Sequence, residues 1–174
     1  MRCAVFIFIL GCFFSCRNED GWYETEIGSE VDVALPATAV FANLSAFEGL
    51  SAAVPDLFWI EKVIEETPTP VRIIVLSDST YFEERLVEVD EDQLQIFYTV
   101  DKTSLPIKDV RHLIKIAQQD DGQKCIISWV TTFVVQEKNR ERIQTKFSGM
   151  QEAYLYSLQL MGVELEEMMN DESF

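Results

Sequence analysis

The order of the expected elements along this chain constrains its fold more than any single motif does. Residues 31–35 alternate between apolar and polar or small side chains, residues 37–47 carry apolar side chains at helical spacing, and a second short helical piece follows Gly49. Six segments with the period of a strand come next, joined by short loops, which favours antiparallel pairing of consecutive strands. These segments are residues 57–65, 71–76, 80–89, 93–101, 110–118 and 124–135.

The last part of the chain predicts one long amphipathic helix of about 30 residues, about 45 Å in length. Gly149 is expected to let this helix bend or lie close to a strand. We therefore predict an α+β fold, in which a curved antiparallel sheet of about seven strands wraps around the C-terminal helix. Apolar side chains recur on the helix at steps of three and four, at Ile143, Phe147, Met150, Tyr154, Leu158, Met161, Leu165 and Met168.

The first sixteen residues differ from the rest of the chain. Arg2 precedes an apolar run over residues 3–14, which is too short to span a bilayer comfortably, and a polar stretch follows Cys16. We predict a secretory signal over residues 1–16, and its end resembles a lipoprotein signal with Cys16 as the lipidated residue. Cys12 marks a rival cleavage site, and an ordinary signal peptide or an uncleaved anchor is the alternative.

The predicted organisation is therefore a signal over residues 1–16, a tether over residues 17–29 and one domain over residues 30–170. The expected location is across the inner membrane, periplasmic or at the cell surface, held to the membrane by the lipid anchor. Two glycines and few apolar side chains in residues 17–29 are the basis for the tether.

Charge and cysteine content exclude several classes of function. The chain has 30 acidic and 14 basic residues, a net charge of −16, and its acidic residues are spread along it, so no nucleic-acid partner is expected. Outside the first sixteen residues the only cysteine is Cys125, and His112 is the only histidine, which cannot supply a zinc ligand set. The sequence has no glycine-rich phosphate loop and no nucleophile elbow, and no cofactor is expected.

Several short motifs occur in an order and at a spacing found in one large superfamily. They are residues 33–41 followed by 47–50 and Pro55, residues 84–86 with Asp90 and then 105–107, and residues 128–129 with Phe133. The chain thereby resembles the helix-grip (SRPBCC, START-like) superfamily, which includes START lipid-transfer domains, polyketide cyclase/dehydrase-like proteins and plant abscisic-acid receptors. The resemblance implies the fold described above, but it says little about function, because such a fold hosts many activities.

The chain departs from this pattern at three places. Ala53 and Val54 stand where such proteins often carry a Trp-His pair, and Val110 stands where they often have a tyrosine. Residues 77–79 contain no glycine, unlike the gate loop of the hormone receptors. A receptor-like gate is therefore not expected.

Strand alternation and the helix stripe together predict which side chains line an internal pocket. The resemblance implies that Glu84 faces this pocket, and alternation places Leu86 and Glu88 on the same side. Glu84 could instead pair with Arg72, Arg85 or Arg111. The predicted pocket residues are Phe82, Glu84, Leu94, Ile96, Tyr98, Val110, His112, Trp129, Thr131, Phe133, Phe147, Met150, Tyr154 and Leu158.

Three functions remain open at this point. The first is a binding or carrier domain for an apolar or amphipathic small molecule, since a few polar groups in an apolar cavity are typical of such sites. The second is a cyclase- or dehydratase-type enzyme with Glu84 or His112 as general base and Tyr98 as proton donor. The third is a structural or interaction protein whose interior is filled by its own side chains, His112 being then an ordinary core residue.

Overall fold

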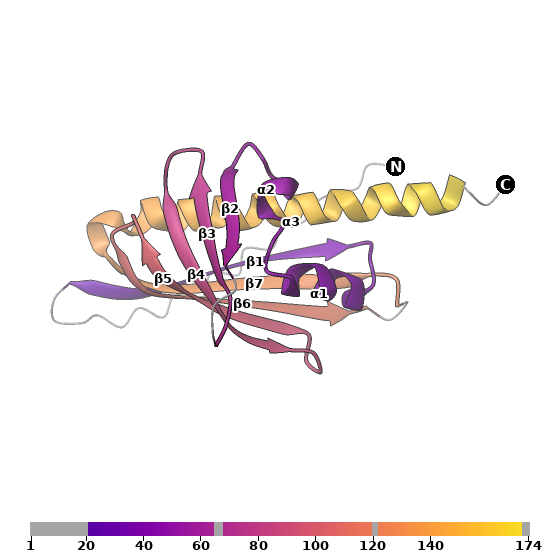
Figure 1. Cartoon of the computed structure of the whole chain (residues 1–174), viewed down its shortest axis with the longest axis horizontal. Coiled ribbons are helices and arrows are strands. Elements are labelled where there is room, and N and C mark those ends of the chain that lie inside the picture. The colour runs from indigo at the N-terminus through magenta and orange to yellow at the C-terminus, as the bar shows by residue number, and fades with distance from the viewer. Residues whose placement is uncertain (1–20, 65–67, 120–121, 172–174) are drawn as a thin grey trace.

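The computed structural model describes residues 21–64, 68–119 and 122–171, and its side chains as far as residue 163. The predicted signal, Cys16 and the first part of the predicted tether lie outside these residues. Figure 1 shows a strongly curved sheet with one long helix running along it. The elements are β1 (Trp22–Val33), α1 (Ala37–Ser45), α2 (Leu50–Ala53), β2 (Phe58–Ile64), β3 (Val71–Leu76), β4 (Tyr81–Asp90), β5 (Gln95–Thr103), β6 (Ile107–Gln118), β7 (Cys125–Gln136) and α3 (Glu137–Asp171).

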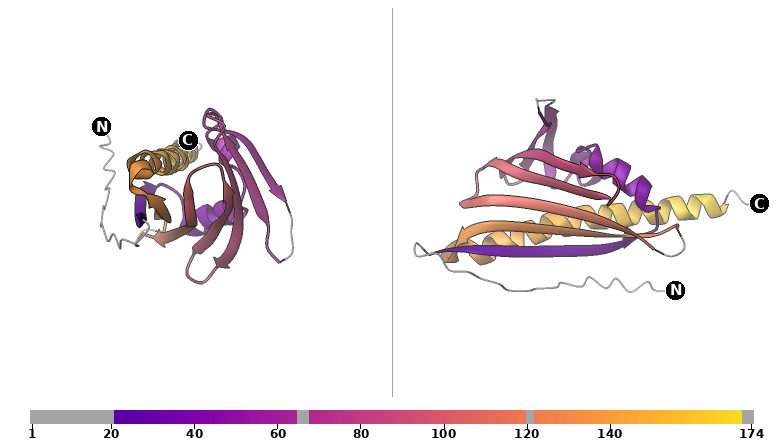
Figure 2. Two further views of the ribbon diagram at one scale, coloured as in Figure 1. Left: turned by 90° about the vertical axis from the view of Figure 1, so that its left-hand side faces the viewer. Right: turned by 90° about the horizontal axis from the view of Figure 1, so that it is seen from below.

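The seven strands form one antiparallel sheet in the order β1-β7-β6-β5-β4-β3-β2. The end-on view in Figure 2 shows the sheet curling from β1 and β7, beside α3, round to β2 and β3. Helix α3 packs mainly on β1 and β7. The predicted α+β architecture, a curved sheet around a C-terminal helix with two short helices after the first strand, is confirmed.

Strand alternation explains why one face of the sheet is buried. Every second residue of β7, from Cys125 to Val135, is buried, and the residues between them are only partly covered. Side chains of successive residues point to opposite faces of a sheet, so this pattern turns one face toward α3. Ile143, Phe147 and Leu158 of α3 are buried in the same core.

The first strand corrects the predicted tether. Strand β1 begins at Trp22 and pairs with β7 along its whole length, so residues 22–29 belong to the sheet. The inward-facing residues here include Thr25 and Ser29, which are buried although they are polar. Because these small polar residues replace the apolar ones expected of a half-buried strand, the segment resembles a linker in sequence.

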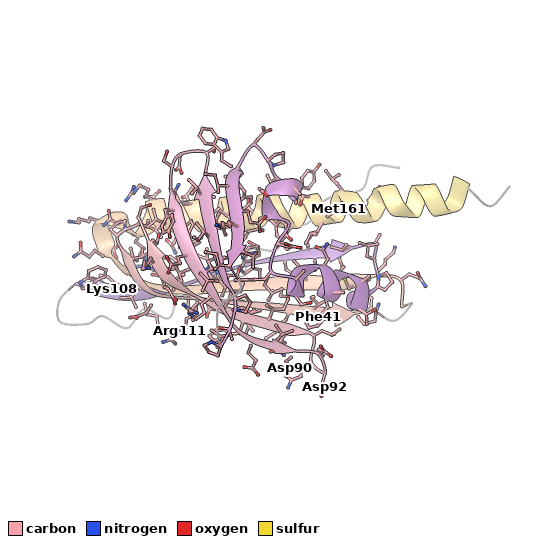
Figure 3. All side chains as sticks on the ribbon, viewed as in Figure 1. Phe41, Asp90, Asp92, Lys108, Arg111 and Met161 are labelled. Atoms are coloured by element: carbon pink, nitrogen blue, oxygen red, sulfur yellow. The ribbon has the colours of Figure 1, made fainter. Side chains whose placement is uncertain are left out.

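Three expectations about individual side chains were also wrong. Leu94 lies in the turn before β5 with a φ of 51° and is only partly buried. Glu88 is exposed, because a bulge between Leu86 and Glu88 changes the side of the sheet on which the residues that follow point. Met161 is 39% exposed on α3 (Figure 3).

The glycine that approaches the sheet region closely is Gly162 rather than Gly149. A Cβ atom at Gly162 would lie 3.0 Å from the backbone nitrogen of Ala34, whereas a Cβ at Gly149 would meet nothing within 4 Å. Within residues 21–64, 68–119 and 122–171, no helix combines the length and apolar character needed to cross a membrane.

Candidate functional site

Buried polar side chains from neighbouring strands meet on the face of the sheet that is turned toward α3. Strand pairing places Arg72 beside Glu84, Tyr98 beside His112, and His112 beside Thr131. All five side chains are buried among apolar neighbours. Because a buried polar group is costly unless it is paired, the partners of each one decide what this cluster can do.

An ion cluster forms one half of the site. The guanidinium of Arg72 donates two hydrogen bonds to Oε2 of Glu84, from Nε at 3.0 Å and from Nη2 at 2.6 Å. Glu61, on β2, lies 3.7 Å from Nη1 of Arg72, and its Oε2 accepts hydrogen bonds from the backbone N–H groups of Gly49 and Ser51. Arg72 is therefore the common cationic partner of the Glu84 and Glu61 carboxylates.

Aromatic rings enclose this cation. The guanidinium carbon of Arg72 lies 4.2 Å from the ring centroid of Phe47 and 5.5 Å from that of Tyr98. Phe47 holds its ring there with a φ of 59°, a left-handed conformation that a bulky residue rarely adopts. Burial raises the pKa of Glu84 above its ordinary value, and Arg72 opposes that rise.

His112 forms the other half of the site. Its Nδ1 lies 2.8 Å from Oγ1 of Thr131, and Nε1 of Trp129 donates to the same Nδ1 at 3.4 Å. Gln151 of α3 donates to Oγ1 of Thr131 at 2.8 Å and accepts a hydrogen bond from Ser29 at 3.0 Å. A chain of hydrogen bonds thus connects β1, α3, β7 and β6.

Four buried side-chain polar atoms have no hydrogen-bond partner among the described residues: Oγ1 of Thr25, Oε1 of Glu61, the hydroxyl of Tyr98 and Nε2 of His112. The last two are carried by neighbouring rings. The two rings stack with their centroids 4.5 Å apart, and Nε2 of His112 lies 4.0 Å from Oε1 of Glu84. Since most buried polar groups in native proteins are paired, two such atoms on neighbouring rings are consistent with a binding site.

The surroundings fix the protonation states of both rings. Burial, together with the Arg72 guanidinium, lowers the pKa of His112 to about 3, so the imidazole is neutral near pH 7. Burial and the Glu84 carboxylate hold the pKa of Tyr98 well above its ordinary value. The phenol therefore keeps its proton.

The structure brings together nearly all of the side chains that the sequence predicted for the pocket. Leu94 is the exception, since it lies partly buried at the rim of the core. Their aromatic rings pack closely against one another: Phe147 contacts both Phe82 and Phe133, and Tyr154 contacts Trp129 edge-on. The buried members of the predicted set are Phe82, Glu84, Ile96, Tyr98, Val110, His112, Trp129, Thr131, Phe133, Phe147, Met150, Tyr154 and Leu158.

Sequence reasoning missed three members of the site: Glu61, Phe47 and Gln151. It named Arg72 only as one of three possible partners of Glu84. Arg72 lies at the second position of β3, between Val71 and Ile73, and an arginine in a short apolar strand is the one signal that marked it. Gln151 lies four residues after Phe147 and three before Tyr154, so the helical period places it on the inward face, and it was missed because only apolar side chains were counted in the stripe.

A surface depression of about 590 Å³ lies between α3, the turn from β3 to β4 and the residues before β2. Leu76 and Met150, both core residues, form part of its lining. Lys146 of α3 pairs with Asp78 in the turn and donates to Oγ1 of Thr80 at 3.0 Å. This contact ties the helix to the turn at the edge of the depression.

The described residues include no group of three or more His, Cys, Asp or Glu side chains that could hold a metal ion. Residues 24–159 match the family model described as polyketide cyclase / dehydrase and lipid transport. No curated protein matches the sequence.

Solved structures resemble the whole domain. XoxI from Bacillus cereus aligns with a TM-score of 0.71 at 19% identity, over 81% of this chain and 97% of that one. Norcoclaurine synthase from Thalictrum flavum aligns with a TM-score of 0.70 at 14% identity, over 84% and 91%. Zhui aromatase/cyclase from Streptomyces sp. R1128 aligns with a TM-score of 0.70 at 15% identity, over 80% and 93%. At these identities the likeness concerns the fold.

Proposed function

This chain belongs to the polyketide cyclase / dehydrase and lipid transport family, and we propose that it binds and carries an apolar or amphipathic small molecule between the sheet and α3. One observation carries the proposal. The hydroxyl of Tyr98 and Nε2 of His112 are buried without partners on two stacked rings, beside the Arg72–Glu84 pair and within the apolar core. A small molecule with one polar group would satisfy them, and its apolar part would lie against the aromatic rings.

The filled-core alternative is favoured by the close packing of those same rings. Phe147 lies with its ring centroid 5.2 Å from that of Phe133 and 5.9 Å from that of Phe82. In a purely structural core, however, an ion cluster beside two unpaired polar atoms would not increase the stability of the fold. Replacing such groups by apolar residues of similar volume is often neutral or stabilising.

A cyclase-type enzyme is the third candidate, because Glu84, His112 and Tyr98 do lie together. Their chemistry supports it less well than binding. A general base works best with a pKa near the operating pH, whereas the pKa of His112 is lowered to about 3. Glu84 accepts two hydrogen bonds from Arg72 through Oε2, so this carboxylate is held in an ion pair and is a weaker general base than a free one.

Native mass spectrometry of the purified full chain, with solvent extraction of whatever accompanies it, tests the binding function. The expected result is a discrete bound mass that is soluble in organic solvent. Met150→Trp, in the buried interior, should reduce the bound fraction, because a larger side chain fills the site. Leu160→Trp, on the exposed side of the same helix, is the matched control and should retain it.

The same proteins titrated with Nile red, an uncharged apolar dye, provide a second readout. We expect saturable binding by the unmodified chain and by Leu160→Trp, with clearly weaker binding by Met150→Trp. If no bound mass is found and no protein binds the dye saturably, the filled-core alternative is correct and the binding function is wrong.

A membrane tether completes the proposal. Residues 1–16 would serve as a secretory signal, and Cys16 would carry the lipid that holds the domain at a membrane surface. Mass spectrometry of the mature N-terminus tests this directly. A diacylated or triacylated Cys16 is the expected result, and an unmodified N-terminus would refute the tether while leaving the binding function intact.

A further inference from the structure

Trp129 and Thr131 both contact Nδ1 of His112, and Trp129 indicates the direction of the hydrogen bonds in the unmodified protein. An indole N–H can only donate, so Nδ1 of His112 must accept. The hydroxyl of Thr131 then donates to Nδ1, and its oxygen accepts from the amide of Gln151, whose carbonyl oxygen accepts from Ser29. With Nδ1 as acceptor, the proton of the neutral imidazole is on Nε2.

The site therefore presents two uncharged donors on two neighbouring rings. One is the N–H at Nε2 of His112 and the other is the O–H of Tyr98, and both atoms are buried without partners among the described residues. The rings that carry them are stacked, with centroids 4.5 Å apart. Two such donors suit one acceptor oxygen, which has two lone pairs.

No positive charge is left over for an anion. Arg72 is the one buried cation among the described residues, and it already faces Glu84 and Glu61. Oε1 of Glu84 lies 4.0 Å from Nε2 of His112, so a carboxylate or phosphate bound to the two donors would lie close to another negative group. Burying a second anion there would be costly.

We infer that the polar group of the ligand is an uncharged oxygen acceptor, a ketone, aldehyde or ester carbonyl, held by His112 and Tyr98, and that the site discriminates against carboxylates and phosphates. The inference rests on the proposed binding function and names its ligand class. Thr131 and Gln151 are positioning residues, because they set which nitrogen of His112 carries the proton.

Three probes of the same shape test the ligand class: 2-acetylnaphthalene, 2-naphthoate and 2-ethylnaphthalene. Isothermal titration of the full chain at pH 7.5 should show the ketone binding at least tenfold more tightly than either of the others. Tyr98→Phe should weaken the ketone about tenfold, the loss expected for one hydrogen bond. Tyr156→Phe, on the exposed face of α3, is the matched control and should change nothing.

Naphthoate binding as tightly as the ketone, or more tightly, would overturn the inference and leave the binding function standing. Ethylnaphthalene binding as well as the ketone would also overturn it, since the two donors would then contribute nothing. If none of the three probes binds while the protein carries a bound mass or binds Nile red saturably, the inference about the ligand class is wrong and the binding function stands. If the bound mass and the dye binding are absent as well, the proposed function itself fails.

The tautomer is tested separately by ¹⁵N NMR of the imidazole, whose signals are unambiguous because the chain has one histidine. We expect a proton on Nε2 and none on Nδ1. Gln151→Glu should reverse the Thr131 hydroxyl toward the new carboxylate. Because the Thr131 contact with Nδ1, at 2.8 Å, is shorter than the Trp129 contact, at 3.4 Å, the proton should then move to Nδ1, with loss of the ketone preference. If that buried charge prevents folding, Thr131→Val should give a mixture of tautomers. A proton on Nδ1 in the unmodified protein would refute the hydrogen-bond direction.

Discussion

Mild acid is predicted to destabilise this fold through one side chain, His112. The imidazole is 2% exposed, and its pKa is lowered to about 3 in the folded protein, against 6.5 in an unfolded chain. Between these two pKa values, His112 is therefore protonated in the unfolded state and neutral in the folded state. The contribution of His112 to the free energy of unfolding is therefore fully present above pH 6.5, and it is lost as the pH falls from 6.5 toward 3.

The size of the effect follows from the two pKa values. At pH 5 the unfolded chain gains about 2 kcal/mol from protonating His112, and at pH 4 about 3 kcal/mol. Glu84 and Tyr98 lie beside the ring, and the Arg72 guanidinium acts on its pKa. The acids among them also shift stability with pH, so the contribution of His112 must be isolated by difference.

Urea unfolding at pH 7.5 and pH 5.0 provides that difference when the unmodified chain is compared with His112→Gln. Glutamine does not titrate, and every other group is common to both proteins. The unmodified chain should lose about 2 kcal/mol more than the variant between the two pH values. Equal losses would refute the reasoning. An NMR titration of the single histidine with a midpoint near 6.5 would refute it as well, and that measurement needs no variant.

Three further changes have expected outcomes. Gly162→Ala should lower the midpoint of thermal unfolding, because its Cβ would lie 3.0 Å from the backbone nitrogen of Ala34. Gly149→Ala, in the same helix, should raise the free energy of unfolding by about 0.5–1 kcal/mol. If Gly149→Ala destabilised the protein and Gly162→Ala stabilised it, the packing described would be contradicted. Glu84→Gln should cost about 3–5 kcal/mol in urea unfolding, since it leaves a buried arginine poorly paired, and a loss below 1 kcal/mol would show that the pair is not buried in solution. Lys146→Met should raise the pKa of Asp78 from about 2 toward its ordinary value, as followed by NMR of the carboxyl carbon, and an unchanged pKa would show that the ion pair does not form.

The sequence predicted the fold well because the fold depends on the spacing of apolar side chains, which can be recognised without a closely similar sequence. Alternation in β7 and the three-and-four spacing from Ile143 onward correspond directly to the buried faces in the structure. It failed at Trp22, where the strand begins, because Thr25 and Ser29 point inward and remove the apolar period. Ser29 is inward and polar because it donates a hydrogen bond to Gln151 in the site, whereas the buried hydroxyl of Thr25 has no partner among the described residues.

The sequence predicted most of the residues of the candidate site, but it did not predict which of them pair with one another. Period two places Glu84, Tyr98 and His112 on one face, and the structure confirms that placement. It does not say which residue stands opposite which, because that depends on register. Thus Arg72, the partner of Glu84, was one of three arginines that the sequence could not distinguish.

Register in this region depends on a bulge between β4 and β5. Glu83 stands opposite Lys102 and Glu84 opposite Val100, so no residue of β4 stands directly opposite Asp101 in the register. Asp101 instead points outward and pairs with Arg85 at 2.8 Å. Without the bulge, continuing the register from Lys102 would set a second carboxylate opposite Glu84. Bulges commonly re-aim side chains beside functional sites, and this one leaves Glu84 free to hold Arg72 next to the two unpaired donors.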